Sequence, residues 1–178
     1  AEFVREWIAR SGGPVERCEV VPYGIDVAKY TVSARSARGG PLRVLTVGSV
    51  GLRKGSPYVL AAARRMKGKA LFRMVGNVRL PEAPRRELAE TVELVGSVPR
   101  GDILKHFSWA DVFLLPSICE GSATAVYEAM ATGLPIVCTP NTGSIVRHEV
   151  DGFIVPLRDV DAIVRALDAL AHDRDMRE

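Results

Sequence analysis

The sequence predicts an α/β protein built on a doubly wound parallel sheet. From residue 42 onward, short apolar segments alternate with stretches of helix-forming residues, and glycine or proline separates most of them. Most of the apolar segments are continuous rather than interleaved with polar residues, which is typical of strands covered on both faces. This alternation favours right-handed βαβ units in an open, Rossmann-like sheet.

The expected elements follow one another in a regular order. Continuous apolar runs predict strands at Leu42–Val47, Ala70–Val75, Val92–Val95, Val112–Leu115, Pro135–Thr139 and Phe153–Val155. Helix formers or helical spacing of apolar residues predict helices at Ala1–Ser11, Ser56–Met66, Glu82–Glu90, Asp102–Ser108, Thr124–Thr132, Ser144–Glu149 and Asp159–Ala171. Asp102 is expected as an N-cap and Gly133 as a C-terminal cap.

Composition excludes several classes of protein. With 178 residues, the chain is long enough to bury its own hydrophobic core. Its composition, 47% apolar and 25% charged, is typical of a soluble globular domain. The net charge is +3 without a dense basic block, so we expect no nucleic-acid binding. Apolar runs fall short of the ~18 residues of a membrane span, and charges near the first residue do not fit a signal peptide.

The cysteines and aromatic residues are expected to be structural. The three cysteines form no C-x-x-C pair, which excludes a disulfide framework and a structural zinc site and favours a cytoplasmic setting. Each cysteine is expected to be a small buried hydrophobe. Trp7, Phe107, Trp109 and Phe113 are expected in the core. The three histidines lack a third ligand nearby, so no metal site and no catalytic role are assigned to them.

The loop after the first sheet strand combines glycines with two cations. Gly48, Gly51 and Gly55 allow tight turns, and Arg53 and Lys54 precede a helix start. The pattern is neither G-x-G-x-x-G nor a P-loop. Backbone N–H groups with two cations could bind an anion. A glycine loop with solvated cations explains this segment equally well.

Two acids follow the fourth strand. Glu120 lies in the strand-to-helix loop and Glu128 inside the helix, up to ~12 Å apart along its axis. That exceeds the ~5–9.5 Å of a glycosidase pair. The spacing suits a long ligand with hydroxyls at both ends and negative charge over the helix N-terminus, as in a nucleoside diphosphate sugar. Taken alone, the two acids are better explained as a helix-start acid (Glu120) and a surface acid (Glu128).

Two further segments are weaker candidates. Val95–Pro99 follows the third strand and, with Val98, could form a flat surface and backbone hydrogen bonds for a nucleotide base. An ordinary strand-ending turn explains this segment at least as well. Asn141–Ser144 could present N–H groups to a second phosphate edge, and a turn is the favoured interpretation.

Together these segments resemble a known family, the retaining group 1 glycosyltransferases of GT-B fold. The resemblance is to their carboxyl-terminal donor-binding domain and runs from about Val20 to Leu170. The motifs that carry it, in order, are Val21–Asp26 (VPYGID), Arg53-Lys54-Gly55, Ala110–Ser117 (ADVFLLPS), the Glu120/Glu128 pair with Glu128–Ala131 (EAMA), and Gly152–Pro156 (GFIVP).

The resemblance implies roles for individual residues. Arg53 and Lys54 would neutralise the diphosphate, Glu120 would contact the transferred sugar, and these three would be catalytic. Glu128 would hold the ribose hydroxyls. The full set of implied donor-binding residues is Gly51, Arg53, Lys54, Val98, Glu120, Gly121, Ser122, Thr124, Ala125 and Glu128. Neither a cofactor nor a metal ion is expected.

Some positions depart from the family pattern. Ser49 stands where many members have Arg, so Arg53 could supply that charge. Ala123 replaces a common Gly, and Ser144 a common Glu, so no donor contact is assigned to Ser144.

The resemblance also implies that a complete enzyme has a second domain, which this sequence does not contain. Residues 1–40 are interpreted as an interdomain connection and 41–178 as the donor domain of a GT-B enzyme. The amino-terminal acceptor-binding domain would be the partner of this half, which is expected to be inactive alone. Peripheral membrane association through that missing domain stays open.

Three alternatives remain at the level of the sequence. A nucleotide-sugar epimerase half would share the fold, but no clear acid/base set is present. A non-catalytic nucleotide-binding module would need no chemistry. A nicotinamide-dependent oxidoreductase predicts G-x-G-x-x-G, which the first strand-to-helix loop lacks.

Overall fold

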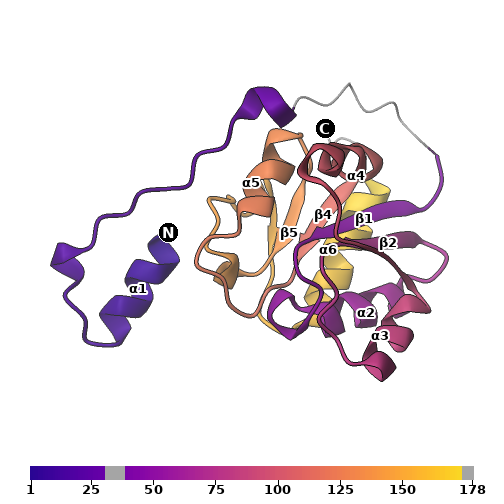
Figure 1. Ribbon diagram of the computed structural model, residues 1–178, viewed down its shortest axis with the longest axis horizontal. Coiled ribbons are helices and arrows are strands. Elements are labelled where there is room, and N and C mark those ends of the chain that lie inside the picture. The colour runs from indigo at the N-terminus through magenta and orange to yellow at the C-terminus, as the bar shows by residue number, and fades with distance from the viewer. Residues whose placement is uncertain (31–38, 174–178) are drawn as a thin grey trace.

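The predicted sheet is confirmed, and its strand order is that of a doubly wound fold. The computed structural model describes residues 1–30 and 39–173. All strand pairs are parallel, in the order β3-β2-β1-β4-β5-β6 (Figure 1). The strands are β1 (Leu42–Val47), β2 (Ala70–Val75), β3 (Val92–Gly96), β4 (Val112–Leu115), β5 (Ile136–Cys138) and β6 (Gly152–Ile154).

Helices cover both faces of this sheet. The α-helices are α1 (Glu2–Arg10), α2 (Ser56–Arg65), α3 (Glu82–Ala89), α4 (Ile103–Trp109), α5 (Thr124–Ala131) and α6 (Val160–His172). Buried residues of α2, α3 and α6 belong to one hydrophobic cluster, and those of α4 and α5 to a second. Figure 1 shows α2 and α3 on one side of the sheet and α4 and α5 on the other.

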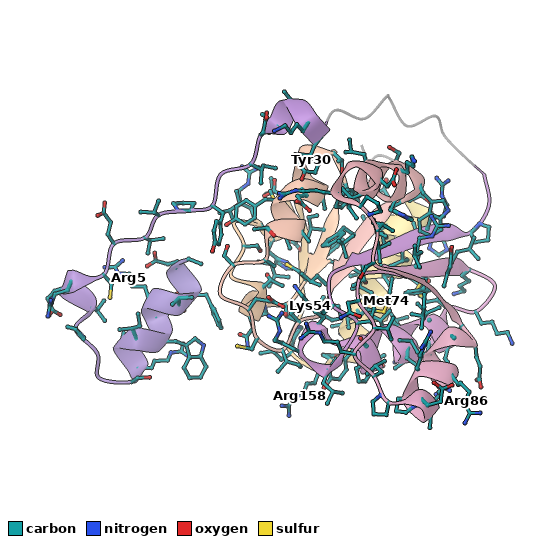
Figure 2. The ribbon with its side chains drawn as sticks, viewed as in Figure 1. Arg5, Tyr30, Lys54, Met74, Arg86 and Arg158 are labelled. Carbon is teal, nitrogen blue, oxygen red and sulfur yellow. The ribbon has the colours of Figure 1, made fainter. Side chains whose placement is uncertain are left out.

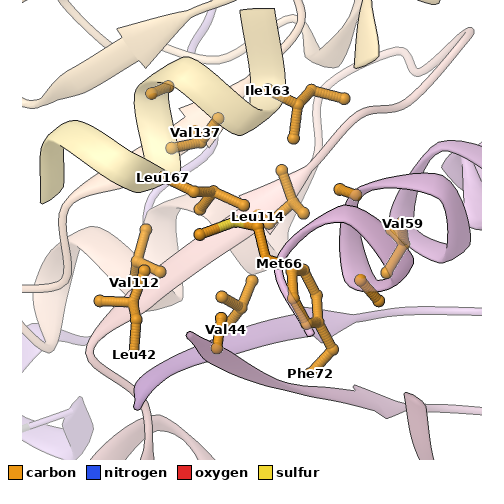
Figure 3. Packing of buried hydrophobic residues seen from close by; sticks show 14 of the residues in the cluster. Leu42, Val44, Val59, Met66, Phe72, Val112, Leu114, Val137, Ile163 and Leu167 are labelled. Carbon is orange, nitrogen blue, oxygen red and sulfur yellow. The ribbon is translucent and has the colours of Figure 1, made fainter. Parts of the chain in front are cut away.

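Strand β4 explains why the apolar runs are continuous. Val112 and Leu114 belong to the first cluster, where Figure 3 shows them with Leu167 of α6. Phe113 and Leu115 belong to the second cluster. All four side chains are fully buried, because successive residues of a strand point to opposite faces and both faces are covered.

The predicted helix over Ser144–Glu149 is wrong. This segment is irregular and ends in a turn in which Glu149 has a φ of 62°. The carboxylate of Asp151 accepts hydrogen bonds from the backbone N–H and the guanidinium of Arg147, which closes the turn in place of a helix. These bonds lower the pKa of Asp151 to about 2, with the Arg147 side chain as the main cause.

Three smaller expectations also fail. Asp102 precedes α4 but makes no capping bond, because its carboxylate pairs with Lys105. Cys119 is exposed and Cys18 only partly buried, since neither lies in a strand of the sheet. Trp7 is half-exposed because α1 has no buried residue among those described.

The segment before the sheet packs into the domain with its last described residues, and its first residue, Ala1, lies beside Gly143. In Figure 1, α1 lies away from the sheet and an extended chain leads back from it to a 3-10 turn, η2 (Val27–Tyr30). Tyr30 is buried in the second hydrophobic cluster, against Phe107. The stretch Ser33–Pro41 is rich in Ser, Gly and Arg, which predicts a loop, and residues 33–38 of it lie outside the described residues. No helix in the described part of the chain is long and apolar enough to cross a membrane.

The loop after β1 is locked against the end of β4 by a glycine. Gly55 has a φ of 76°, and a Cβ atom there would overlap the carbonyl oxygen of Pro116. The backbone N–H of Ile118 donates to the carbonyl of Arg53, 2.9 Å away. Because these contacts join the two loops, they fix where Arg53 and Lys54 lie.

We therefore expect Gly55→Ala to be more destabilising than a glycine substitution of equal backbone strain. Gly68 is the matched control, since its φ is 82° and its added Cβ would meet no atom within 4 Å. Gly68→Ala should cost about 1 kcal/mol, and Gly55→Ala at least about 3 kcal/mol. The corresponding losses of Tm are about 2–4 °C and at least about 6 °C. Equal losses in calorimetric melts would contradict this account of the loop.

Candidate functional site

The candidate site lies where the sheet changes winding direction. Strands β2 and β3 extend the sheet on one side of β1, whereas β4, β5 and β6 extend it on the other. The loops that follow β1 and β4 therefore leave in opposite directions and open a crevice at their carboxyl ends, where doubly wound proteins bind ligands. Arg53 and Lys54 follow β1, and Glu120 follows β4.

The structure brings these three predicted residues into contact. The Lys54 Nζ atom lies 2.9 Å from Oε1 of Glu120, and the Arg53 Nη1 atom lies 2.6 Å from Oε2. Lys54 and Glu120 are each only 8% exposed, whereas the Arg53 side chain is 59% exposed. Figure 2 shows Lys54 within the domain, while Arg86 and Arg158 lie at its periphery. Each carboxylate oxygen of Glu120 thus has its own cation.

Glycine and hydroxyl groups hold this cluster in place. A Cβ atom on Gly48 would lie 2.8 Å from Cε of Lys54, so the lysine side chain passes directly over that glycine. The buried Ser117 hydroxyl donates to Oε1 of Glu120 at 3.3 Å. The Glu120 backbone N–H donates to the carbonyl of Asn141 at 3.0 Å, and the Asn141 amide donates to the carbonyl of Ile118 at 2.8 Å. The loops after β4 and β5 therefore support each other.

Helix α5 begins beside the cluster with an open N-terminus. Its N-cap residue is Ala123, which has no side-chain acceptor, and no capping bond is made. The first backbone N–H groups of a helix lack intrahelical partners and carry partial positive charge. Thr124 at the start of the helix is exposed, and Ala125 is buried. A negative group placed here would meet these N–H groups together with Arg53.

The two residues Gly121 and Ser122, just before α5, differ in what they can offer a ligand. Gly121 is exposed, consistent with close approach by a ligand. The Ser122 hydroxyl instead donates to the carbonyl of Gly143 at 3.1 Å and lies 3.2 Å from the Tyr127 hydroxyl. The predicted contact of Ser122 with a ligand is therefore left to its backbone.

Glu128 lies one turn further along α5 and has partners that the sequence did not indicate. The Tyr30 hydroxyl donates to its Oε1 atom at 2.7 Å, and Arg100 Nη2 is 4.0 Å from the same oxygen. Burial raises the pKa of Tyr30, and the hydrogen bond to Glu128 raises it further, so the hydroxyl stays a donor. The Glu128 side chain is 14% exposed.

Two predicted residues take supporting positions. The carbonyl of Gly51 accepts hydrogen bonds from both the backbone N–H and the hydroxyl of Ser56, which closes the loop after β1. Val98 packs partly into the second hydrophobic cluster, in the connection that also carries Arg100. Within residues 1–30 and 39–173, no group of three or more His, Cys, Asp or Glu side chains could hold a metal ion.

Comparison with known proteins identifies the family. A family model described as glycosyl transferases group 1 matches residues 41–173, so the chain belongs to that family. The amylovoran biosynthesis glycosyltransferase AmsK of Erwinia amylovora is 32% identical over an aligned length of 172 positions, and the match covers 88% of this chain and 42% of AmsK. The chain spans about half the length of the curated relatives it matches.

Solved structures share the fold. The crystal structure of Anabaena Alr3699/HepE in complex with UDP and glucose matches with a TM-score of 0.84 and 20% identity, covering 99% of this chain and 53% of that one. The C-terminal domain of LpcC, a group 1 family protein from Francisella tularensis, matches with a TM-score of 0.75 and 18% identity. That match covers 86% of this chain and 91% of the LpcC domain.

The buried pair of Lys54 and Glu120 should be energetically coupled. A double-mutant cycle of Lys54→Met and Glu120→Gln, measured by urea unfolding, should give a coupling energy of about 1.5–3 kcal/mol. The control cycle uses Lys105 and Asp102, an ion pair of the same residue classes that is largely solvated. That pair should give about 0.5 kcal/mol or less. Coupling at Lys54/Glu120 no larger than in the control would contradict the geometry described here.

Proposed function

We propose that this chain is the donor-binding half of a retaining glycosyltransferase. The enzyme would move a sugar from a nucleoside diphosphate sugar to an acceptor such as a glycan, glycolipid or polysaccharide precursor. One observation carries the proposal: Glu120 sits between Arg53 and Lys54 at the uncapped end of α5. This places positive charge and a carboxylate together at the switch point of the sheet.

The diphosphate is the part of such a substrate that this site fits best. Two cations and an open helix N-terminus converge on one crevice, and each of them favours a negative ligand. In the free chain both cations are occupied by Glu120. An incoming diphosphate would take over part of that role, most readily at Arg53, whose side chain is largely exposed.

The two acids would then bind hydroxyl groups at the two ends of the substrate, the transferred sugar and the ribose. Glu120, on the loop, is placed for hydroxyls of the transferred sugar, and Glu128, further along α5, for hydroxyls of the ribose. Carboxylates accept charge-assisted hydrogen bonds from such groups. Both carboxylate oxygens of Glu120 are already paired with cations, and the proposal assigns Glu120 a contact with the sugar.

Catalysis by this half would consist of stabilising the leaving group. Negative charge grows on the diphosphate as the glycosidic bond breaks, and preorganised cations and helix N–H groups lower the barrier most when they face that charge. The proposal assigns this role to Arg53, Lys54 and α5, without a cofactor or metal ion. Transfer with retention would also need groups on the acceptor-binding domain.

Known relatives support the choice of substrate class. Anabaena HepE was crystallised in complex with UDP and glucose, and AmsK is named a glycosyltransferase of amylovoran biosynthesis. In our proposal, residues 41–178 are the donor domain and residues 1–40 lead to it from an amino-terminal acceptor domain. We place the whole enzyme in the cytoplasm, with any membrane contact made through that other domain.

Nucleotide binding tests this proposal directly. Among UDP, GDP and ADP titrated into the chain by calorimetry, at least one should bind. Lys54→Ala and Glu128→Ala should each weaken it by at least ~1.5 kcal/mol, about tenfold, because each removes a charge-assisted contact. Lys67→Ala and Glu90→Ala remove the same charges from exposed positions and should leave the affinity unchanged. No binding, or equal affinity in all four variants, would overturn the proposal.

A further inference from the structure

A cavity of about 640 Å³ lies between the last described residues before the sheet and the start of α4. Residues between Gly24 and Tyr30 form one wall, and residues between Arg100 and Leu104 form the other. The first wall lies outside residues 41–173, which the family model matches. It belongs to the segment that the sequence indicated only as a connection, so nothing so far assigns it a part in binding.

Tyr30 connects this wall to Glu128. The residue is 6% exposed, and its ring packs edge-on against Phe107 with centroids 6.4 Å apart. This packing fixes the ring, so the hydroxyl that donates to Oε1 of Glu128 has a fixed position. Tyr30 therefore holds one oxygen of the carboxylate from a site 98 residues away in the sequence.

Arg100 completes the surroundings of Glu128. Its guanidinium approaches the same Oε1 atom and also lines the cavity. Both of these contacts are made to Oε1, and none to Oε2 of Glu128 occurs among the described residues. Glu128 does not itself line the cavity, but both of its neighbours, Tyr30 and Arg100, do, so they connect the carboxylate to the cavity.

We infer that the segment Gly24–Tyr30 forms part of the donor's nucleoside subsite, with Tyr30 positioning Glu128 for the ribose and the adjoining cavity receiving the base. This inference rests on the function proposed above. The cavity is suited to a flat heterocycle, because Ile25, Ile103 and Leu104 offer apolar surface to its faces. Arg100 and the backbone at Gly101 offer polar contacts to its edges.

The arrangement predicts what the Tyr30 hydroxyl contributes. Without it, Oε1 loses its buried donor and the carboxylate gains freedom to turn. The ribose would then bind a less ordered partner, which costs affinity only when ribose hydroxyls are present. The affinity for a nucleotide without those hydroxyls should therefore not change. A general loosening of the fold would instead weaken both kinds of nucleotide, so comparing the two affinities distinguishes these explanations.

The test compares a ribonucleotide with its 2′,3′-dideoxy form. With the best binder among UDP, GDP and ADP, the wild-type chain should prefer the ribose form by at least about tenfold. Tyr30→Phe should reduce this preference at least threefold and leave dideoxynucleotide affinity unchanged. Tyr23→Phe removes a hydroxyl from an exposed position directly before this segment and should keep the wild-type ratio.

The outcomes distinguish the inference from the proposed function. If no diphosphate binds the wild-type chain, the proposed function fails and the inference with it. If a diphosphate binds and Tyr30→Phe keeps the wild-type ratio, the inference fails while the function stands. If the wild-type chain binds the ribose and dideoxy forms equally well, Glu128 does not bind the ribose hydroxyls. The positioning role of Tyr30 would then be contradicted as well.

A second variant tests the cavity itself. Gly101 lines the cavity, and a Cβ atom added there meets nothing within 4 Å. Gly101→Phe should therefore fold normally and narrow the space for a base. It should weaken the nucleoside diphosphate at least threefold and leave inorganic pyrophosphate, used as a probe without a base, unchanged. Equal effects on the two ligands, or none, would contradict the assignment of the cavity.

Discussion

The ion triad of Arg53, Lys54 and Glu120 is the interaction on which the site depends. It joins the loop after β1 to the loop after β4 across the point where the sheet reverses its winding. Lys54 and Glu120 are almost fully buried, so neither could stay charged there at low cost without the other. The backbone contacts around Gly55 and Asn141 hold both loops to the geometry that the triad requires.

This arrangement keeps positive charge oriented before any ligand arrives. In a protein interior, reorienting dipoles and charges after binding is costly, so groups fixed in advance bind and stabilise charge more effectively. Here Glu120 holds the two cations in place, and the open end of α5 adds N–H groups beside them. In the proposed function, the cluster would bind the diphosphate through its cations and contact sugar hydroxyls through its carboxylate.

Much of the fold and the centre of the site could be predicted because they follow local rules. The continuous run Val112–Leu115 indicates a strand covered on both faces, and parallel strands bring their carboxyl-end loops to one edge. Lys54 and Glu120 were therefore expected together. Tyr30 could not be found in this way, since its contact with Glu128 depends on how a distant segment packs. The helix predicted at Ser144–Glu149 failed because Asp151 captures Arg147, a contact that no local propensity encodes.

The most direct test of the central claim is to observe which backbone amides respond to a nucleoside diphosphate. In ¹⁵N NMR titrations with UDP, GDP and ADP, the account predicts that the largest shifts occur in the loop containing Arg53 and Lys54 and at Gly121–Ala125. Smaller shifts should appear around Glu128. Shifts that cluster instead at the opposite edge of the sheet, around Gly68 and Thr91, would show that the triad is a structural contact and that the ligand binds elsewhere.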